Sequence, residues 1–234
     1  LYMDRCFVWG FYTGLSFETI VEGDNAYFPN GVIINQSGFE GNVHSLSIQS
    51  LYRRIIINQS IFGNQYGTAQ AIVIKPPLSV VINSENIAAN TNNKKELRMN
   101  DCNIFSSTGE AIYIENINDA TFNNFNIYDA VVYDPGYTSQ AINIIDSLAI
   151  TFDNCLIATN SSHTNALYVL IQNSQRILFD KCAFAGSRRA GSSIGIFGSS
   201  NIRFYSPAYF ETVAIDYYQY PSSSDVIFND VVAF

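Results

Sequence analysis

The sequence predicts an all-β solenoid, a coil of short strands whose outline repeats along the chain. One segment, AINIIDSLAITFDNCLI at residues 141–157, recurs in outline as AIYIENINDATFNNFNI, ALYVLIQNSQRILFDKCAF and SIGIFGSSNIRFYSPAYF. Apolar residues alternate within each copy and β-branched and aromatic residues dominate, whereas no long stretch keeps a helical period. Irregular repeats of this kind indicate strands stacked in successive coils, with insertions forming loops.

One position, which we call the mark, aligns the copies. Cys155 is the mark of the segment above, three residues after Phe152. The marks of the other copies are Cys6, Ser37, Ser60, Cys102, Phe125, Cys182 and Pro207. Successive marks are 23 to 31 residues apart, except between Ser60 and Cys102, where residues 76–99 lose the register. The pattern predicts roughly eight to nine coils.

The repeated strands resemble those of a known architecture. The AIxI strand, the IxFxNC strand and the Asn or Asp near the mark are similar to those of the right-handed parallel β-helix of the pectate-lyase-like superfold, and they cover most of the chain. The resemblance implies an all-β, right-handed, single-stranded parallel β-helix and says little about chemistry. The segment FVWGFYTGLSFE also resembles the opening coil of many bacteriophage tailspike β-helices. That second resemblance implies a tailspike or tail-fibre domain.

The domain prediction is one β-helix over residues 1–234. The chain begins in mid-coil, so we expect a fragment of a longer protein that lacks N-terminal and C-terminal regions. Polar, Gly- or Pro-containing stretches predict loop insertions at 22–31, 63–70, 83–96, 128–140, 158–165 and 185–192. The last three fall at equivalent places and project from one edge. By analogy with β-helical carbohydrate enzymes this edge flanks a binding groove; alternatively, they are plain surface loops.

Composition and missing motifs narrow the function classes. The chain is 47% hydrophobic with a formal charge of −8, which argues against nucleic acid as a partner. It shows no signal peptide and no apolar run long enough for membrane insertion. His44 and His163 each stand alone in the sequence, and catalytic triads, phosphate loops and zinc spacings are absent, so we expect no cofactor. The His- and Asp-rich signatures of pectin-degrading enzymes are missing too, which lowers the rank of lyase or epimerase chemistry.

The four cysteines all occupy the mark position. Their shared register predicts buried free thiols that fill an interior column, with no disulfide and no metal site. A bridge between Cys155 and Cys182 is the alternative, because only these two marks lie on adjacent coils. A metal site would lack a histidine nearby.

Strand alternation predicts two columns of side chains on the outer face of the solenoid. The first contains Val73, Tyr113, Asn143, Tyr168, Gly195 and Asp216, and the second contains Lys75, Glu115, Ile145, Leu170, Phe197 and Tyr218. Aromatic rings stack on sugars, and amides and carboxylates accept from hydroxyl groups. The glycan-binding residues that we predict are Tyr113, Tyr133, Tyr137, Asn143 and Tyr168.

The second column turns from polar to apolar along the chain. Outward Ile145, Leu170 and Phe197 would form a contiguous apolar patch, which soluble proteins usually cover. Homotrimer formation about the solenoid axis, as in phage tailspikes, would cover it, and a C-terminal segment folding back would also do so.

The catalytic candidates are carboxylates on two columns. The position two before each mark is almost wholly Asn or Asp, and Asp153 and Asp180 hold it on adjacent coils. Two carboxylates on successive rungs could approach the ~5–5.5 Å separation of a retaining glycosidase, and their repulsion would raise one pKa. The structural alternative is a corner residue in left-handed conformation, which Asn and Asp tolerate. Glu115 is the other candidate, and the acids that could act with it are Asp146, at the end of its strand, and Asp134 in the 128–140 loop.

Three functions remain open. The first is a tailspike-like homotrimer at the virion surface, outside the cell, that recognises bacterial surface polysaccharide and hydrolyses it as an endo-acting glycoside hydrolase with paired carboxylates. The second is the same scaffold without catalysis, an adhesin or structural part of a virion. The third is a secreted, monomeric polysaccharide-degrading enzyme.

Overall fold

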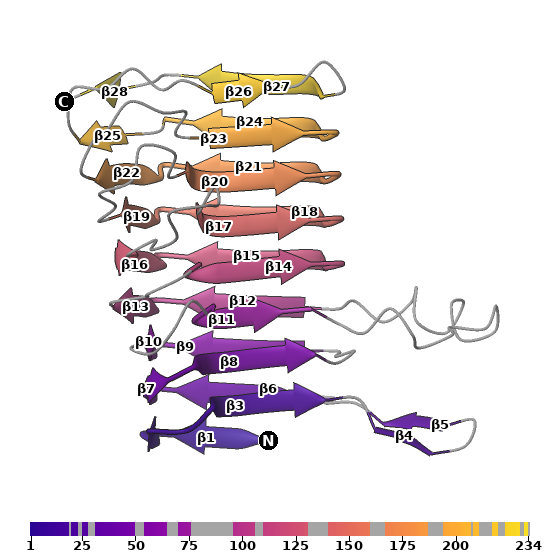
Figure 1. The fold of residues 1–234 in the computed structure, drawn as a ribbon, viewed down its shortest axis with the longest axis vertical. Coiled ribbons are helices and arrows are strands. Elements are labelled where there is room, and N and C mark those ends of the chain that lie inside the picture. Colours follow the sequence, from indigo (N-terminus) through magenta and orange to yellow (C-terminus); the bar gives the residue numbers. More distant parts are fainter. Residues whose placement is uncertain are drawn as a thin grey trace.

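The chain forms a stack of coils built from parallel strands. The computed structural model describes residues 1–18, 20–22, 25–27, 31–49, 54–64, 70–75, 96–105, 110–130, 140–159, 167–186, 194–206, 208–210, 217–219, 223–229 and 232–233. These residues form strands and turns, and β1 lies at one end of the stack and β27 at the other (Figure 1). None of them forms a helix long and apolar enough to cross a membrane. The predicted fold class, an all-β solenoid of stacked parallel strands, is confirmed.

Three parallel sheets, here named A, B and C, run the length of the stack, and their described strands number nine, nine and eight. Sheet A contains β1 (Tyr2–Asp4), β6 (Val32–Asn35), β9 (Arg54–Asn58), β12 (Glu96–Asn100), β15 (Asn118–Asn123), β18 (Leu148–Asp153), β21 (Gln175–Asp180), β24 (Ser200–Tyr205) and β27 (Ser224–Asn229). Sheet B contains β2 (Phe7–Trp9), β7 (Gly38–Asn42), β10 (Ile61–Asn64), β13 (Asn103–Phe105), β16 (Asn126–Ala130), β19 (Leu156–Thr159), β22 (Ala183–Gly186), β25 (Ala208–Phe210) and β28 (Val232–Ala233).

Sheet C contributes the third strand of each coil. It contains β3 (Thr13–Glu18), β8 (His44–Gln49), β11 (Ile72–Ile74), β14 (Ile112–Glu115), β17 (Gln140–Ile145), β20 (Leu167–Gln172), β23 (Ile194–Phe197) and β26 (Tyr217–Gln219). A separate antiparallel hairpin, β4 (Ile20–Glu22) and β5 (Asn25–Tyr27), extends from the side of the stack (Figure 1). Strand β12 pairs directly with β9 in sheet A.

The turn from sheet A to sheet B corrects one detail of the sequence interpretation. The Asn or Asp two before each mark ends its strand in register with its neighbours, so the column itself is present. The left-handed conformation lies one residue later, where φ is between 45° and 54°, at Arg5, Gln36, Gln59, Asp101, Asn124, Asn154, Lys181 and Ser206. The Asn and Asp side chains are therefore selected for their contacts along the column. Asn58 Nδ2 donates to Asn35 Oδ1 at 2.9 Å, and Asn100 Nδ2 donates to Asn58 Oδ1 at 2.9 Å.

The described marks follow this left-handed residue, and those after Cys6 point inward. Where the mark is Ser or Cys, its side chain donates back to the carbonyl two residues earlier, as Ser60 Oγ does to Asn58 at 2.9 Å and Cys155 Sγ to Asp153 at 3.3 Å. Cys102, Cys155 and Cys182 are buried, and all four cysteines are free thiols in this structure. Burial raises the pKa of Cys102 to about 12. Serine and cysteine exchange at the mark because each is small and each can donate to the same carbonyl.

Stacked aromatic rings occupy the core of the upper coils. Phe122, Phe152, Phe179, Phe204 and Phe228 follow one another along sheet A with ring centroids 4.5 to 4.8 Å apart. Their rings are within 8° of parallel because parallel strands repeat the same side-chain position on every rung. The stack fixes the coils in register and thereby fixes the outer faces that carry candidate sites.

The register of sheet C corrects the predicted outer columns. Asn143 pairs with Tyr113 on one side and with Leu170 on the other, so Leu170 takes the place predicted for Tyr168. The same shift of two pairs Gly195 with Tyr218 in place of Asp216, and Ile145 with Gln172. Alternation has a period of two, so a shift of two preserves which side chains face outward while it changes their neighbours. Of the predicted loops, 22–31 overlaps the antiparallel hairpin of β4 and β5, and the other five lie largely outside the described residues.

Candidate functional site

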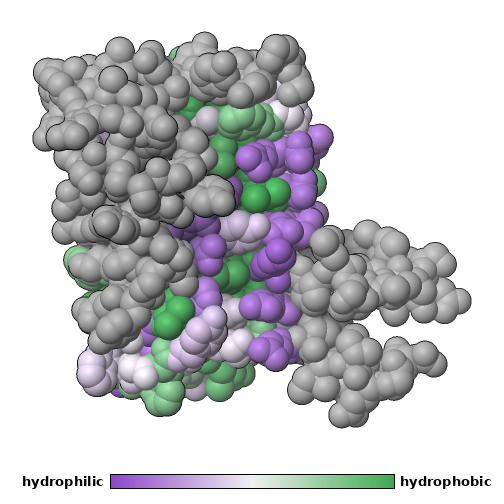
Figure 2. Space-filling view, viewed as in Figure 1, coloured by the Kyte–Doolittle hydropathy of each residue, from purple (hydrophilic) through white to green (hydrophobic). Residues whose placement is uncertain are grey.

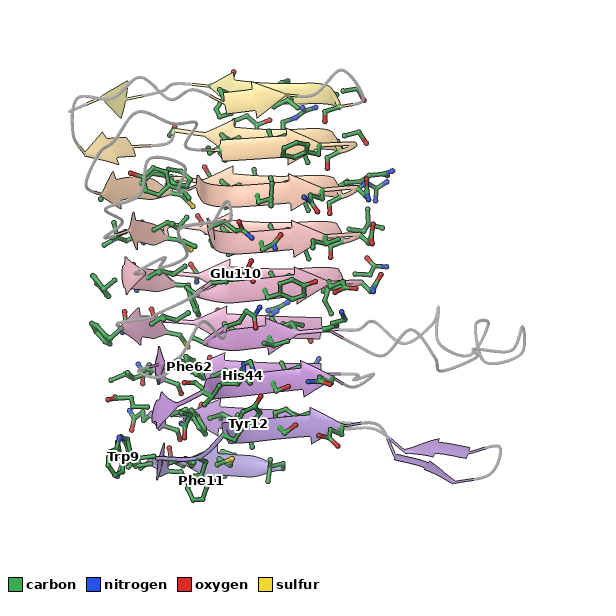
Figure 3. All side chains as sticks on the ribbon, viewed as in Figure 1. Trp9, Phe11, Tyr12, His44, Phe62 and Glu110 are labelled. Atoms are coloured by element: carbon green, nitrogen blue, oxygen red, sulfur yellow. The ribbon has the colours of Figure 1, made fainter. Side chains whose placement is uncertain are left out.

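Polar side chains gather on the face of the solenoid that carries sheet C. Figure 2 shows hydrophilic residues running along the part of this face that the described residues form. One set lies at the edge where the strands begin, and strand pairing stacks its members on successive rungs. This set, here the edge column, consists of His44, Gln70, Glu110 and Gln140. Figure 3 shows His44 below Glu110 along this edge, with Tyr12 below both.

Glu110 is the centre of the edge column. Its carboxylate accepts hydrogen bonds from Gln70 Nε2 at 3.2 Å, from Asn143 Nδ2 at 3.0 Å and from Gln140 Nε2. Burial raises the pKa of Glu110 above the ordinary glutamate value, although the three amide donors pull the pKa down. Glu110 therefore holds its proton at a pH where an exposed glutamate is ionised.

Two amide oxygens beside Glu110 face no donor. Gln140 and Asn143 are 5% and 6% exposed, and each donates its amide nitrogen to Glu110. In the described part of the chain, Gln140 Oε1 and Asn143 Oδ1 find no hydrogen-bond partner. Leaving a buried acceptor unpaired costs about 1–3 kcal/mol, so this arrangement is unfavourable for folding.

A second carboxylate, Glu115, lies at the far end of β14. Lys75 Nζ contacts Glu115 Oε2 at 2.8 Å, and Tyr113 donates its hydroxyl to the same oxygen. Burial would raise the pKa of Glu115, but the hydrogen bonds from Lys75 and Tyr113 and the charge of Lys75 outweigh burial, so its pKa is lowered. Glu115 is 9% exposed, and its lowered pKa favours its ionised form.

Tyr113 lies between the two carboxylates. It pairs with Asn143 across the rungs, while its hydroxyl bonds Glu115, and Glu110 and Glu115 both contribute to its raised pKa after burial and the hydrogen bond. Lys75 Nζ lies over the Tyr113 ring, 5.9 Å from its centroid. The tyrosine thus stays a neutral hydrogen-bond donor, and one face of its ring meets an ammonium group.

The structure gathers some of the predicted site residues and separates others. Tyr113, Glu115 and Asn143 lie together, and exposed Asp146 is close enough to Tyr113 to affect its pKa. Asp153 and Asp180 pair with each other at the opposite end of the sheet A strands, so they belong to a different corner. A six-residue strand, Leu148–Asp153, spans about 20 Å. The Asp153–Asp180 pair therefore lies too far from the residues around Tyr113 to act on the same bond as they do.

The predicted aromatic residues are divided in a similar way. Tyr133 and Tyr137 fall outside the described residues, in the connection from β16 to β17. Tyr168 packs partly buried against the core and meets the Phe184 ring edge-on, with centroids 5.7 Å apart. Because Leu170 pairs with Asn143, the predicted place of Tyr168 beside Asn143 in the outer column was wrong.

Sequence reasoning missed Glu110 and the setting of His44. A signal for Glu110 existed, because QAIVI, EAIYI and QAINI repeat a polar residue directly before the AIxI strand. His44 is isolated in sequence, but its Nδ1 lies 2.8 Å from the Gln70 carbonyl oxygen and its ring meets Tyr12 edge-on. Among the described residues, no three His, Cys, Asp or Glu side chains come together as a metal ion would require.

Comparison with known proteins leaves the chain without a family. Neither the family models nor the curated proteins match it. Among solved structures, it is similar to a "putative glycosyl hydrolase" from Parabacteroides merdae ATCC 43184, with 9% identity and a TM-score of 0.46 over 87% of this chain and 82% of that one. It is also similar to QnrB1, a plasmid-mediated fluoroquinolone resistance protein, with 7% identity and a TM-score of 0.17 over 98% and 92% of the two chains. These values are too low to carry an argument about function.

Proposed function

We propose that the sheet C face binds a polysaccharide and hydrolyses its glycosidic bonds, with Glu110 as the general acid and Glu115 as the general base. The observation that carries this proposal is the opposite direction of the two pKa shifts on one face. Environments that push two carboxyl pKa values apart assign one group to donate a proton and the other to accept one.

The spacing of the two glutamates favours attack by water. Five residues of extended strand place their Cα atoms about 16 Å apart, and both side chains turn toward the Tyr113–Asn143 pair. The ~5–5.5 Å of a retaining pair and the ~6.5–9.5 Å of an inverting pair are distances between carboxyl groups. Side chains that turn toward each other from this Cα separation fit the wider, inverting spacing, in which a water molecule lies between base and sugar. The bond from the anomeric carbon to the bridging oxygen breaks, and Glu110 protonates that oxygen. The water oxygen bonds to the anomeric carbon, and Glu115 takes its proton.

Substrate hydroxyl groups have acceptors on the same face. Gln140 Oε1 and Asn143 Oδ1 are buried and lack donors among the described residues, so a sugar hydroxyl that reached either one on binding would satisfy it. The connection that holds Tyr133 and Tyr137 leads directly into Gln140. We therefore propose that glycan binding centres on Gln140 and Asn143.

The biological setting that we propose is the tailspike-like one. The opening segment supports it by resemblance, and half-buried Ile145 and Phe197 on sheet C fit a surface that a homotrimer would cover, whereas Leu170 is already buried within one chain. The substrate would then be a bacterial surface polysaccharide. Light scattering on the purified protein checks the trimer, and a monomer would favour a secreted enzyme.

A digest of bacterial surface polysaccharides, resolved by size and by new reducing ends, tests the proposed chemistry. We expect shortened glycan with the wild type and with the control variant Asp101→Asn, whose carboxylate lies on the sheet A corner, and no shortening with Glu110→Gln or Glu115→Gln. Asp153→Asn and Asp180→Asn test the rival pair. Binding without shortening by the wild type would contradict hydrolysis and favour a non-catalytic adhesin, and thermal unfolding of each variant verifies its fold.

A further inference from the structure

A groove on a different face of the solenoid carries a set of charges that the proposed reaction does not use. It measures about 840 Å³ and lies over the outer face of sheet A, across β6, β9, β12 and β15. Its lining includes Ile33, Arg54, Glu96, Arg98, Asp119 and Thr121. Its volume falls within the ~300–1,000 Å³ typical of ligand sites.

Glu96 holds two arginines side by side in this groove. Arg54 Nε contacts Glu96 Oε2 at 2.8 Å, and Arg98 Nε contacts Glu96 Oε1 at 2.6 Å. Both guanidinium groups meet the carboxylate through Nε, and the two arginine side chains remain 62% and 57% exposed. Their Nη groups are thus oriented by Glu96, and among the described residues they have no acceptor, so they can meet one from solvent.

Another arginine on the same sheet shows what a satisfied guanidinium looks like. Arg203 lies in the same outer column as Arg98, four strands further along. Its Nη2 contacts Asp225 Oδ2 at 2.7 Å, and its Nη1 donates to the Asp225 carbonyl oxygen at 2.7 Å. Both Nη groups of Arg203 therefore bind the protein. Arg54 and Arg98 contact Glu96 only through Nε, which leaves their Nη groups for a ligand.

We propose that this groove binds a singly charged oxyanion carried by a sugar, either a carboxylate or a phosphodiester. A planar guanidinium fork recognises such groups through paired, charge-assisted hydrogen bonds. The side-chain charges of the lining residues Arg54, Arg98, Glu96 and Asp119 cancel, so these side chains favour a single negative charge over a dianion. Ile33, 39% exposed, offers an apolar floor for a sugar ring, and Asp119 and Thr121 offer partners for its hydroxyl groups.

That the sugar belongs to a polysaccharide rests on the proposed function, but the anion site does not. A polymer bound along sheet A would be held away from the sheet C face, where the two glutamates lie. The groove would thus select charged glycans and tether them, while cleavage would take place on another face.

Binding measurements by titration calorimetry and NMR test this site with glucuronate, a glucose methyl phosphodiester, inorganic phosphate and glucose. We expect one or both singly charged sugars to bind, and glucose to bind at least about tenfold more weakly because it forms no charged hydrogen bond. Arg54→Gln and Arg98→Gln should each weaken anionic binding by about tenfold or more, and Arg203→Gln should not. Asp119→Asn should increase the affinity for inorganic phosphate, because it removes a negative charge from the groove.

Equal binding of glucose, or equal weakening by Arg203→Gln, would overturn the inference. Phosphate binding to the wild type more tightly than either singly charged sugar would do so too. Glu115→Gln separates this site from the proposed reaction, because it should abolish shortening of glycan and leave anion binding unchanged. Anion binding without any hydrolysis would support the anion site and contradict the proposed hydrolysis. Hydrolysis without anion binding would support the hydrolysis and contradict the anion site.

Discussion

Two polar columns run along this solenoid, and they differ in regularity. The corner column at the end of sheet A consists of Asn35, Asn58, Asn100, Asn123, Asp153 and Asp180, and its first amides donate along the column from rung to rung. The edge column of sheet C changes residue type at almost every rung and surrounds a partly buried carboxyl with three amide donors. Residues that repeat on each coil meet a need of the fold, whereas an arrangement that is not repeated and costs stability indicates a functional site.

The energetic contrast supports this distinction. The Asn and Asp side chains of the corner column are half-buried, except for exposed Asn123, and hydrogen bonds between the first amides replace part of the lost hydration. Glu110 has its pKa raised by burial, and two amide oxygens next to it lack donors among the described residues. Both features oppose folding, so the fold alone gives no reason to place them together.

The largest expected effect separates the two columns by activity. Glu110→Gln removes the proton donor while it preserves size, so we expect hydrolysis of a glycan substrate to fall about 10²- to 10⁴-fold. Asp180→Asn alters the corner column and should change the rate less than about twofold. Initial rates of reducing-end formation measure both. A larger loss for Asp180→Asn than for Glu110→Gln would reverse the assignment of the two columns.

The pH dependence of the rate sharpens the comparison on the sheet C face itself. Activity requires Glu115 ionised and Glu110 protonated. The lowered pKa of Glu115 places the acid limb below the ordinary glutamate value, and the raised pKa of Glu110 places the alkaline limb above it. We expect a bell-shaped profile that falls about tenfold per pH unit beyond each limb. Lys75→Met should move the acid limb upward, because Lys75 lowers the pKa of Glu115. A profile whose acid limb stays in place would contradict this role of Lys75.

Stability tests the corner column directly. Asn100→Ala removes the donor to Asn58 Oδ1, so we expect the free energy of unfolding to fall by about 1–2 kcal/mol with hydrolysis unchanged. Urea denaturation measures the loss, and Thr151→Ala, on the outer face of sheet A, controls for the change in strand propensity. A loss of activity without a loss of stability would place function in the corner column.

The fold could be predicted from the sequence because its signals recur on every coil. The strand alternation and the marks identify sheets and turns wherever loops leave them intact. The residues that pair across rungs were harder to predict, because ALYVLI fits the AIxI frame in two ways that differ by two residues. In the structure Val169 pairs with Ile142. Tyr113, Glu115 and Asn143 were found on adjacent, well-aligned coils. Glu110 was missed because only its contacts with Asn143 and the neighbouring Gln side chains distinguish it from another strand-start residue.

The smallest expected effect concerns the marks, the most regular feature of the corner. Cys155 Sγ donates to the Asp153 carbonyl at 3.3 Å, and that carbonyl also accepts from Asn124 N at 2.9 Å. Serine makes the same contact at Ser37 and Ser60. Cys155→Ser should therefore cost less than about 1 kcal/mol in the free energy of unfolding, since the lost packing is offset by a stronger donor. Cys155→Leu should cost more, about 1–3 kcal/mol, because it overfills a packed interior. If serine proved as costly as leucine in urea denaturation, the marks would depend on sulfur itself, and their interchange along the chain would need another cause.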